Sequence, residues 1–471
     1  MAKPFPQLRE GQAPEGSFDV AIVGAGAVGC AVARELTRHG ARCVLVEAGP
    51  DVGAGTSKAN TAIHHTGFDA KPETIESRLV ARGYELLSAY ASEVGIPTAG
   101  LGALMVAWTP EQREALPGMQ AAAVENGYEE TRPVDLEELY AREPNLGTGA
   151  EGAIEIPGEG IVCPFTTTLA FATEALAGGC QLVLNAAVSG VRAVGGGHEL
   201  DTARGRIRAE YLVNAAGLWS DEIDAMLGHT DFRVTPRRGE LIVFDKLARG
   251  LVNHILLPVP TEKTKGVLVS PTIYGNVLLG PTADDIEDKT DRSTTGSGLA
   301  GLMEAGERII PRLVRHEVTA TYVGLRAATE HRDYQLEAHP EQRYVCAGGI
   351  RSTGISGSLG IAEWVRGALA DVGLQLSEPS APAGFRMPNI GEFGTRPYQD
   401  GELIGRDPDY GRIVCFCERV TRGEIDAALD SPIPPVDADG LRRRTRALMG
   451  RCQGFFCGAE IADALEAKDG D

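Results

Sequence analysis

The chain has 471 residues, of which 43% are hydrophobic and 23% charged, and its formal net charge is −20. This length predicts two or three domains, and the composition is that of a folded globular enzyme rather than of a disordered or fibrous chain. The strong negative charge argues against a nucleic-acid partner, because nucleic acids bind to basic surfaces.

No stretch of the sequence has the character of a membrane anchor or a secretory signal. No apolar run reaches the roughly 18 residues that cross a bilayer, and the first 20 residues lack an apolar signal core. The nine cysteines, an odd number, indicate a reducing compartment. We therefore expect a cytoplasmic protein that would reach the inner membrane only through a partner subunit; hetero- and homo-oligomers both stay open.

The first predicted unit is a strand, a turn, a helix and a second strand. Residues 20–23 are apolar throughout, as in a parallel strand that is covered on both faces. A helix should follow over 27–39 and end at Gly40, and the second strand should run over 43–46. This order predicts the beginning of an α/β domain.

The turn of this unit is rich in glycine. Gly24, Gly26 and Gly29 form G-x-G-x-x-G between strand and helix, and Glu47 ends the second strand. The first glycine permits the tight turn, the second lets a pyrophosphate approach the backbone, and the third lets the helix pack on the strand. The helix N-terminus attracts phosphate, and the acid accepts hydrogen bonds from ribose hydroxyls. We predict a dinucleotide site, although this fingerprint alone does not distinguish NAD from FAD.

The middle of the chain mixes both kinds of element. Residues 75–95 and 110–127 favour helices, and residues 151–164 favour strand and turn. A helix and a strand follow, and a further strand ends in small residues at Gly217. Apolar and polar residues alternate over 237–284, which predicts antiparallel sheet.

A second glycine-rich turn between a strand and a helix lies late in the chain. It is "AGGIRSTGISGSLGIAE", residues 347–363, and its helix dipole would stabilise negative charge on a reduced flavin ring. The strand at 212–221, "LVNAAGLWSD", also ends in small residues that let backbone approach a ligand. The two segments together favour FAD, because an extended flavin dinucleotide needs contacts from distant parts of a chain.

The C-terminal part has a different composition. Residues 376–410 are rich in Pro and Gly and predict a linker, so residues 411–471 should form a separate module. The module carries cysteines as C-x-C and, 34 residues later, C-x-x-x-x-C: Cys415, Cys417, Cys452 and Cys457. Four thiolates suit zinc or an iron–sulfur cluster, and disulfides are the weaker alternative. Structural zinc more often uses C-x-x-C pairs, so the spacing favours a cluster.

The chain resembles the FAD-dependent D-amino-acid-oxidase-like superfamily in "GTSKANTAIHHTGFDAKPET", "NAAGLWSD", "PRRGEL", "GVLVSPTIYGNVLLGPTADD" and "YVGLRAATEHRD". Over residues 18–375 it is similar to the large subunit of anaerobic glycerol-3-phosphate dehydrogenase and to L-2-hydroxyglutarate oxidases. This resemblance implies an α/β fold in which a Rossmann-type FAD-binding domain is combined with a mainly antiparallel substrate domain. The FAD-binding segments would be about 18–95, 155–235 and 330–375, and the substrate segments about 96–154 and 236–329.

The tail resembles a bacterioferritin-associated-ferredoxin-like [2Fe–2S] module, most closely in "GRCQGFFC". The resemblance implies a small helical module at 411–471 whose four cysteines ligate the cluster, with short helices in "TRGEIDAAL" and "LRRRTRALMG". The basic run 442–446 is either a solvated face or a set of charges that offsets the cluster or docks an acidic partner. A one-electron relay attached to a flavin domain indicates a dehydrogenase that delivers electrons to an acceptor protein or a quinone-linked subunit.

The same resemblance suggests which residues surround the flavin and the substrate. The family pattern S-x-x-N followed by H-x-G is matched here, and it places His65 at the position of the catalytic base; a role in flavin packing is the alternative. His64 is a neighbour that tunes it, and the two adjacent side chains should point apart. The expected FAD contacts beyond the fingerprint are Thr56, Ser57, Asn60, Val188, Ala216, Gly217, Gly354 and Ile355.

For the substrate anion, the resemblance points to Arg326 in "GLRAAT", whose planar fork suits a carboxylate or a phosphate; an ordinary salt bridge is the alternative. Lys263 and Lys265 are weaker candidates for the same pocket. Arg351 stands where relatives often carry an acid, and Cys163 stands where an aspartate often precedes the proline, so the exact substrate stays open.

The expected function is oxidation of a small anionic alcohol, with hydride transfer to FAD, proton transfer to His65 and electron exit through a [2Fe–2S] cluster. Glycerol 3-phosphate is the leading substrate and a 2-hydroxy acid the next. Two alternatives remain, namely an amine or imino-acid dehydrogenase and an electron-transfer subunit of a multi-subunit redox complex without substrate chemistry of its own.

Overall fold

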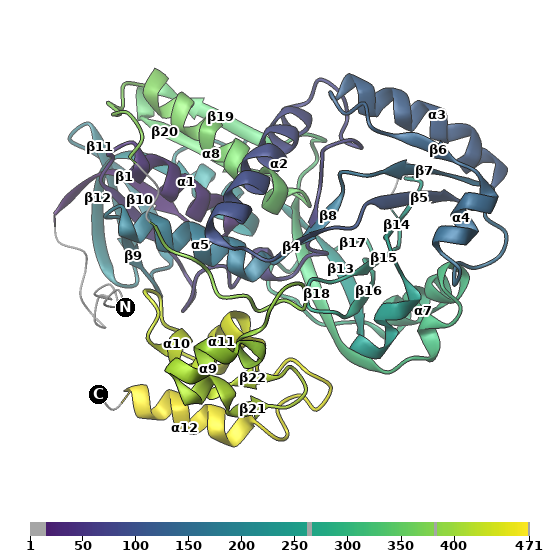
Figure 1. Ribbon diagram of the computed structural model, residues 1–471. Coiled ribbons are helices and arrows are strands. Elements are labelled where there is room, and N and C mark those ends of the chain that lie inside the picture. Colours follow the sequence, from purple (N-terminus) through teal and green to yellow (C-terminus); the bar gives the residue numbers. More distant parts are fainter. Residues whose placement is uncertain (1–15, 261–265, 381–383, 470–471) are drawn as a thin grey trace.

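The structure is a computed structural model that describes residues 16–260, 266–380 and 384–469. Figure 1 shows two halves side by side, one around a largely parallel sheet and one around a mainly antiparallel sheet, with a small module of helices below both. The α/β fold class with an added helical module, as expected from the sequence, is confirmed.

The first half is built on an eight-stranded sheet with a parallel centre. Five strands pair in parallel in the order β20, β12, β1, β2 and β9, and a β10–β11 hairpin and β19 extend the edges in antiparallel fashion. The strands are β1 (Ser17–Val23), β2 (Cys43–Val46), β9 (Gln181–Val183), β10 (Val188–Val194), β11 (Gly197–Thr202), β12 (Gly205–Asn214), β19 (Gln335–His339) and β20 (Tyr344–Gly348). The first strand, first helix and second strand lie where the sequence predicts them.

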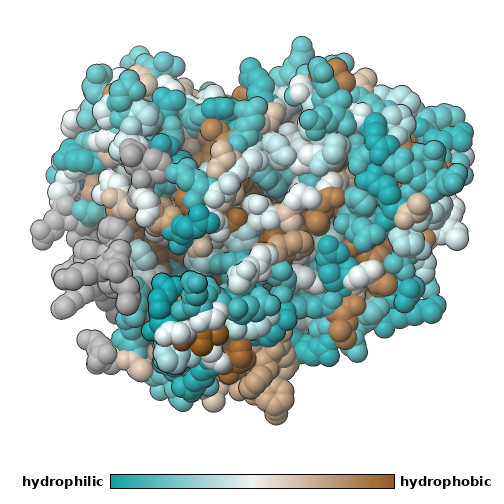
Figure 2. Space-filling view, in the orientation of Figure 1, coloured by the Kyte–Doolittle hydropathy of each residue, from teal (hydrophilic) through white to brown (hydrophobic). Residues whose placement is uncertain are grey.

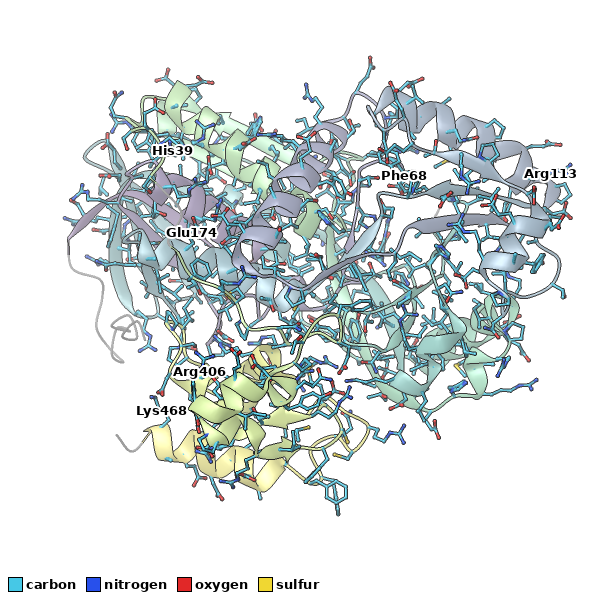
Figure 3. The ribbon with its side chains drawn as sticks, viewed as in Figure 1. His39, Phe68, Arg113, Glu174, Arg406 and Lys468 are labelled. Atoms are coloured by element: carbon cyan, nitrogen blue, oxygen red, sulfur yellow. The ribbon has the colours of Figure 1, made fainter. Side chains whose placement is uncertain are left out.

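Helices cover this sheet and fix its glycine-rich turns. The covering helices are α1 (Ala27–Arg38), α2 (Ile75–Val94), α5 (Pro164–Ala177), α6 (Ser220–Met226) and α8 (Gly354–Asp371). Small side chains let α8 pack closely on α2, since a Cβ at Gly83 would come within 2.2 Å of the Ser356 carbonyl oxygen. Arg34 of α1 donates to Glu174 of α5 at 2.6 Å in the buried layer between these helices (Figure 3).

The second half is built on a nine-stranded sheet. Its strands are β5 (Ala103–Ala107), β6 (Arg132–Val134), β7 (Gly152–Ile156), β13 (Thr235–Phe244), β14 (Ile255–Pro258), β15 (Leu268–Pro271), β16 (Val277–Gly280), β17 (Asp284–Asp285) and β18 (Val318–Ala328). All pairs are antiparallel except β14 with β5. Helices α3 (Pro110–Glu125), α4 (Leu136–Arg142) and α7 (Gly296–Ile309) lie on its outer side (Figure 1).

A three-stranded sheet joins the two halves. It pairs β8 (Gly160–Val162) with β3 (Ile63–His64) on one side and β4 (Thr98–Gly100) on the other. Because β3 and β8 are antiparallel, the residue after β3 and the residue before β8 meet at one end of the sheet. This pairing brings His65 next to Glu159, which are 94 positions apart in the sequence.

The C-terminal module packs around its own small core. It contains β21 (Ile413–Cys415), β22 (Val420–Thr421), α10 (Arg422–Leu429), α11 (Ala438–Thr445) and α12 (Gly458–Asp469), and the helix α9 (Gly401–Arg406) precedes it. The two short helices expected between the cysteine pairs are present. The segment that the sequence assigns to a linker is anchored in its later part, because Ile390 and Arg396 are buried and Arg396 donates to Glu424 at 3.3 Å.

Candidate active site

The dinucleotide fingerprint has the close contacts that require glycine. Gly24 has φ +101°, and a Cβ there would come within 2.5 Å of the Ala215 carbonyl oxygen. A Cβ on Gly29 would come within 1.8 Å of the Gly24 carbonyl oxygen, so this glycine lets α1 pack onto the turn. Gly26 precedes α1 as its N-cap and lines a large cavity, where the N-terminal N–H groups of the helix meet the space for a ligand.

Glu47 is held in place by backbone N–H groups. Its carboxylate accepts from Ala25 N at 2.7 Å and from Gly49 N at 2.8 Å. Burial raises the pKa of Glu47 above its ordinary value, while these N–H donors favour the ionised form. The group also lines the cavity, so it is fixed in a position from which it accepts hydrogen bonds from a ribose.

One cavity of about 1350 Å³ brings together nearly all of the residues expected from the sequence. This volume exceeds that of an ordinary small-molecule pocket, about 300–1,000 Å³, and suits an extended dinucleotide together with a substrate. Gly29 lies outside the lining, because it packs against the turn. The predicted residues in the lining are Gly24, Gly26, Glu47, Thr56, Ser57, Asn60, His65, Val188, Ala216, Gly217, Arg326, Gly354 and Ile355.

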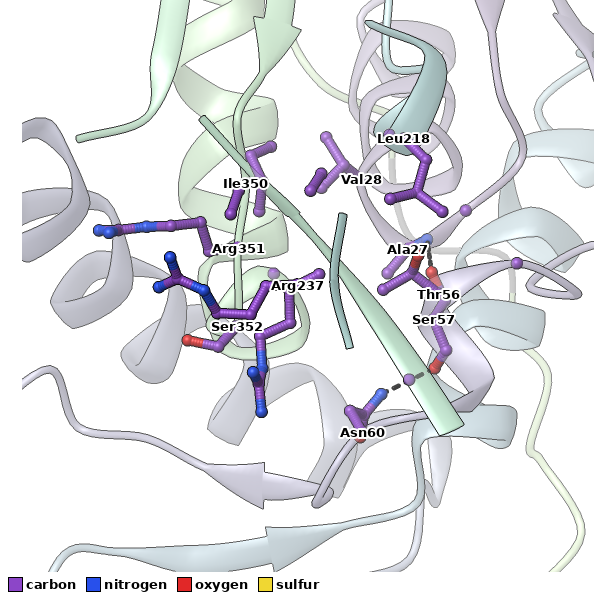
Figure 4. A pocket seen from close by; sticks show the side chains of 18 of the residues that line it. Ala27, Val28, Thr56, Ser57, Asn60, Leu218, Arg237, Ile350, Arg351 and Ser352 are labelled. Carbon is purple, nitrogen blue, oxygen red and sulfur yellow. Dashed lines mark hydrogen bonds between the residues drawn. The ribbon is translucent and has the colours of Figure 1, made fainter. Parts of the chain in front are cut away.

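The loop after β2 links the fingerprint to the second half. Ser57 Oγ accepts from Ala27 N at 2.9 Å, and Thr56 Oγ1 donates to the Leu325 carbonyl oxygen at 2.9 Å. Asn60 Nδ2 donates to the Ser57 carbonyl oxygen at 2.9 Å. Figure 4 shows these side chains on one side of the cavity and Arg237 and Arg351 on the other. The loop thus fixes the first turn of α1 relative to β18.

His65 forms a dyad with a carboxylate that the sequence analysis missed. His65 Nδ1 lies 3.0 Å from Oε2 of Glu159, a side chain that is completely buried. The other carboxylate oxygen accepts from Thr66 N at 2.7 Å and from Thr66 Oγ1 at 3.0 Å. Since an ionised carboxylate only accepts, the Nδ1 proton lies on the histidine, and Nε2 then carries the lone pair. The imidazole is therefore set in the tautomer that a general base needs.

His64 points away from His65, as expected for adjacent residues in an extended segment. It is buried, and its ring lies 4.4 Å from that of Tyr84 between centroids. Burial, and to a lesser degree the neighbouring His65, lowers the pKa of His64 to about 4. His64 does not line the cavity and stays neutral near pH 7, so it is a packing residue.

Two arginines face each other across strands in the cavity wall. Arg237 of β13 and Arg326 of β18 are register partners, a placement that is unfavourable for like charges unless an anion joins them. Asp285 holds Arg237 with contacts of 2.6 and 3.0 Å. Arg326 donates to the Thr282 carbonyl oxygen at 3.1 Å, and within the described parts of the chain it forms no ion pair. Removal from bulk water, followed by the charge of Arg237, lowers the pKa of Arg326 to about 10.

The other basic candidates stand apart from this pair. Arg351 donates to Glu76 at 3.0 Å, so its charge is already matched, although it lines the cavity (Figure 4). Glu76 also accepts from Thr353 Oγ1 at 2.7 Å, which fixes the turn that begins α8. Lys263 and Lys265 lie outside the described residues.

The four cysteines of the module lie at the end of β21, in the loop that follows it and in the loop that precedes α12. Cys457 lies beside Cys415 and adds to the effect of burial, which raises the pKa of Cys415 to about 11. Cys417 and Cys452 form a second close pair. Among the described residues, no three His, Cys, Asp or Glu side chains are arranged around a single ion. The cysteines form two pairs instead of a single site in which four thiolates surround one metal ion. This arrangement suits a two-iron cluster, in which each iron takes two thiolates.

The surroundings of the cysteines also fit such a cluster. The N–H of Phe456, with those of Gly454 and Phe455, lowers the pKa of Cys452 below that of an ordinary thiol. Backbone N–H groups reaching sulfur are the contacts that tune iron–sulfur centres. A Cβ at Gly450 would come within 2.2 Å of Cys417 Cβ, so this glycine lets the two cysteine loops approach each other.

The basic run of the tail is a docking element within the chain. Arg443 and Arg444 are buried and donate to Asp51 at 2.6 Å and at 2.7–2.8 Å, respectively. Burial would raise the pKa of Asp51, but Arg444 and then Arg443 hold it below its usual value. Lys58 adds a 2.8 Å contact to Asp439 of α11. The expectation that the run is a solvated face is therefore wrong for these arginines, which attach the module to the loop beside the cavity.

Comparisons with known proteins agree with both halves of the site. The chain matches the FAD dependent oxidoreductase family over residues 19–367 and the BFD-like [2Fe-2S] binding domain over residues 413–467. No helix within the described ranges is long and apolar enough to cross a membrane.

Relatives and a solved structure extend this match along most of the chain. A glycerol 3-phosphate dehydrogenase of Caloramator mitchellensis is 33% identical over 96% of this chain and 95% of its own length. One subunit of the anaerobic glycerol-3-phosphate dehydrogenase of Escherichia coli is 26% identical over 96% of this chain and 88% of its own. The FAD-bound L-alpha-glycerophosphate oxidase structure from Mycoplasma pneumoniae has a TM-score of 0.75 and 27% identity, covering 80% of this chain and 100% of that one. The chain therefore belongs to the FAD dependent oxidoreductase family, with FAD and a [2Fe–2S] cluster as its cofactors.

Proposed function

We propose that the protein is a glycerol 3-phosphate dehydrogenase that oxidises the secondary alcohol and passes the electrons to an acceptor protein or a quinone-linked subunit. The observation that carries this proposal is that Arg237 and Arg326 line the same cavity as His65 of the His65–Glu159 dyad, and that Arg326 forms no ion pair among the residues that the structure describes. The likeness to a glycerol 3-phosphate dehydrogenase over 96% of the chain supports it.

Each residue has a role that follows from its contacts. Arg326 binds the phosphate. Arg237 adds positive electrostatic potential at the same site, although its ion pair with Asp285 already offsets part of its charge. His65 accepts the hydroxyl proton at Nε2, and Glu159 stabilises the imidazolium that forms. When bound, FAD would supply the hydride acceptor and the [2Fe–2S] cluster a one-electron relay. The cofactor contacts expected from the sequence and the four cysteine ligands are part of this proposal.

The domain division is also part of the proposal. Residues 18–375 would hold the flavin and the substrate, and residues 411–471 would hold the [2Fe–2S] cluster that relays electrons. Residues 376–410 would connect these two domains. This division is supported by the buried contacts of Asp51, in the loop beside the flavin cavity, with the arginines of the tail. Electrons would then leave without oxygen as the direct acceptor.

Anaerobic mixing of the holoprotein with candidate substrates tests the proposal. Glycerol 3-phosphate should bleach the flavin at a concentration at which glycerol, L-2-hydroxyglutarate, proline and sarcosine leave it oxidised. Bleaching by L-2-hydroxyglutarate alone would assign the chain to 2-hydroxy acids, and bleaching by an amine alone would assign it to C–N oxidation. Bleaching by none of them, with reduction by a partner protein, would identify an electron-transfer subunit.

A further inference from the structure

Three phenylalanines stand in solvent directly beside the cysteines of the module. Phe416 lies between Cys415 and Cys417 and is 69% exposed, whereas Phe455 and Phe456, between the other two cysteines, are 84% and 69% exposed. The rings of Phe455 and Phe456 contact edge to face, with centroids 5.2 Å apart. We call these three side chains the aromatic patch. Figure 2 shows apolar surface at the lower edge of the molecule, over this module.

The patch has no role in the fold of the module. The module has a separate core of buried apolar residues, including Val414, Val420, Ile425, Leu441 and Ile461. Exposed aromatic rings are unfavourable in water, and contiguous apolar patches of a few hundred Å² are often sites of interaction. An interaction is therefore the reason to keep these rings outside the core.

The patch lies at the outer side of the cysteine set. Cys415 and Cys457 are buried, whereas Cys417 and Cys452 are half-buried and so lie nearer to the surface. Phe416 directly precedes Cys417, and Phe455 and Phe456 follow Cys452 in the chain, so exposed rings flank this close pair of cysteines in both loops. A protein that covers the patch would therefore reach the cluster by its most accessible edge.

The area of the patch limits what can bind there. At about 200 Å² for each aromatic side chain, the exposed fractions of the three rings amount to roughly 450 Å². A stable protein–protein interface needs about 800 Å² from each partner, whereas transient electron-transfer complexes fall below about 600 Å² from each partner. The size fits a carrier that binds, takes an electron and leaves.

Charge indicates the kind of carrier. The arginines around the loops are matched by acids: Arg451 donates to Asp245 at 2.6 Å and Arg419 to Glu392 at 2.6 Å. Helix α12, which begins directly after Cys457, presents Asp463 and Glu466 to solvent. With a net charge of −20 on the whole chain, the surrounding field attracts basic partners.

We propose that the aromatic patch is the docking surface for a small basic one-electron carrier protein. The carrier presses an apolar surface onto Phe416, Phe455 and Phe456 and is steered there by the acidic surroundings. In each encounter one electron moves from the reduced protein to the oxidised centre of the carrier, and no bond or proton changes place. Two encounters therefore follow each two-electron oxidation. The inference names the acceptor class for the proposed dehydrogenase and rests on that function.

The test uses horse heart cytochrome c as the basic carrier and ferricyanide as an acceptor that needs no docking. Holoprotein titrated to full reduction with dithionite, without excess, is mixed anaerobically with each acceptor. The double variant Phe455→Ser/Phe456→Ser should reduce cytochrome c about tenfold more slowly at limiting concentration and weaken its binding in calorimetry by a similar factor. Its rate with ferricyanide should equal that of the unaltered protein. An unchanged cytochrome c rate or affinity would overturn the proposal.

Two controls and a second test variant make the result specific. Val124→Ser removes a half-exposed apolar side chain from α3, far from the module (Figure 1), and should change neither rate. Phe455→Leu/Phe456→Leu keeps an apolar surface and should retain most of the cytochrome c rate. If the double variant lacks the visible spectrum of the cluster, Phe416→Ser replaces it as the test variant. Phe416→Ser should slow the reduction of cytochrome c and leave the reduction of ferricyanide unchanged.

Other occupants would be recognised by the same variants. If the unaltered protein sediments as a dimer and the double variant as a monomer, the patch binds a second copy of the chain. If the unaltered protein floats with phosphatidylglycerol vesicles and the double variant does not, the patch binds a lipid surface. Either result overturns the proposal. Because dithionite supplies the electrons, failure of docking is separable from failure of the proposed substrate, which the flavin-bleaching experiment measures.

Discussion

The flavin cavity and the cysteine module solve the same problem, the handling of electrons, in opposite ways. The cavity is assembled from segments as distant as Gly24 and Ile355, and hydrogen bonds hold Glu47 and His65 in its wall. The cysteine set comes from two short segments, backbone N–H groups reach the sulfur of Cys452, and Cys417 and Cys452 lie nearer to the surface than the other two cysteines. The difference shows that a cavity for a large ligand needs many distant segments, whereas a cysteine set of this kind needs only two short stretches of chain.

The largest effect that we predict is on the rate of flavin reduction, when the proposed base His65 is replaced. His65→Ala should slow flavin reduction by substrate about 10²-fold or more, because general-base catalysis contributes at least that much, and FAD should stay bound. Stopped-flow absorbance of the flavin measures the rate. His64→Asn is the matched control and should leave the rate within a few-fold, since His64 lies outside the cavity; an equal loss in both variants would argue for a packing role of the pair.

Glu159→Gln tests whether the buried carboxylate acts through His65. The amide keeps the volume but no longer stabilises the imidazolium, so we expect a loss of about 10-fold to 100-fold in kcat, smaller than for the base itself, and an apparent pKa of kcat/KM that is lower than in the unaltered enzyme. A profile that keeps its pKa while activity falls would mean that Glu159 only supports the local fold.

At the anion site, Arg326→Lys should raise the KM for glycerol 3-phosphate about tenfold with a smaller effect on kcat, since a charge-assisted hydrogen bond contributes about 1.5–3 kcal/mol. The arginine loses its charge as pH rises through its pKa of about 10, so KM should climb above that pH. Arg351→Lys is the control, because Glu76 already neutralises Arg351. Steady-state kinetics with both variants would contradict the assignment if Arg351 gave the larger change in KM.

Asp51→Asn tests the contact by which the loop beside the flavin cavity holds the cysteine module. Removing one partner of a buried ion cluster costs about 3–5 kcal/mol, so the module should detach more often and be cut faster in limited proteolysis near residues 384–410. Flavin bleaching should stay normal, because Asp51 does not line the cavity. Asp463→Asn, an exposed acid on α12, should change neither measurement. Equal protease resistance in all three proteins would mean that these contacts do not hold the module.

A further effect concerns stability. The folded pKa of His64, about 4, lies below its ordinary value, so the unfolded state gains a proton first as pH falls from about 6.5. The free energy of unfolding should therefore fall between pH 6.5 and 4 by up to about 3 kcal/mol from this group. His64→Phe should lack that part of the dependence in denaturant titrations, and an identical slope in both proteins would contradict the burial of a neutral His64.

Local sequence patterns predicted much of this structure. Contacts between residues that are far apart in the sequence could not be predicted from such patterns. The turn around Gly24 follows from residues within one strand–turn–helix unit, and the cysteine spacing indicated the cluster. Glu159 was missed because only the pairing of β3 with β8 brings it to His65. The sequence gives Arg237, in "PRRGEL", no evident role, because its importance depends on its register with Arg326. The burial of Arg443 and Arg444 depends on docking, which a run of basic residues does not reveal.

The central claim is that substrate electrons pass from the cavity to the cysteine module. Rapid-freeze electron paramagnetic resonance after anaerobic mixing with glycerol 3-phosphate tests it most directly, with Cys452→Ser as the comparison. We predict that the signal of the reduced [2Fe–2S] cluster rises after the flavin bleaches in the unaltered protein, and that Cys452→Ser bleaches equally fast without this signal. A bleached flavin beside an intact cluster that stays oxidised would contradict the account.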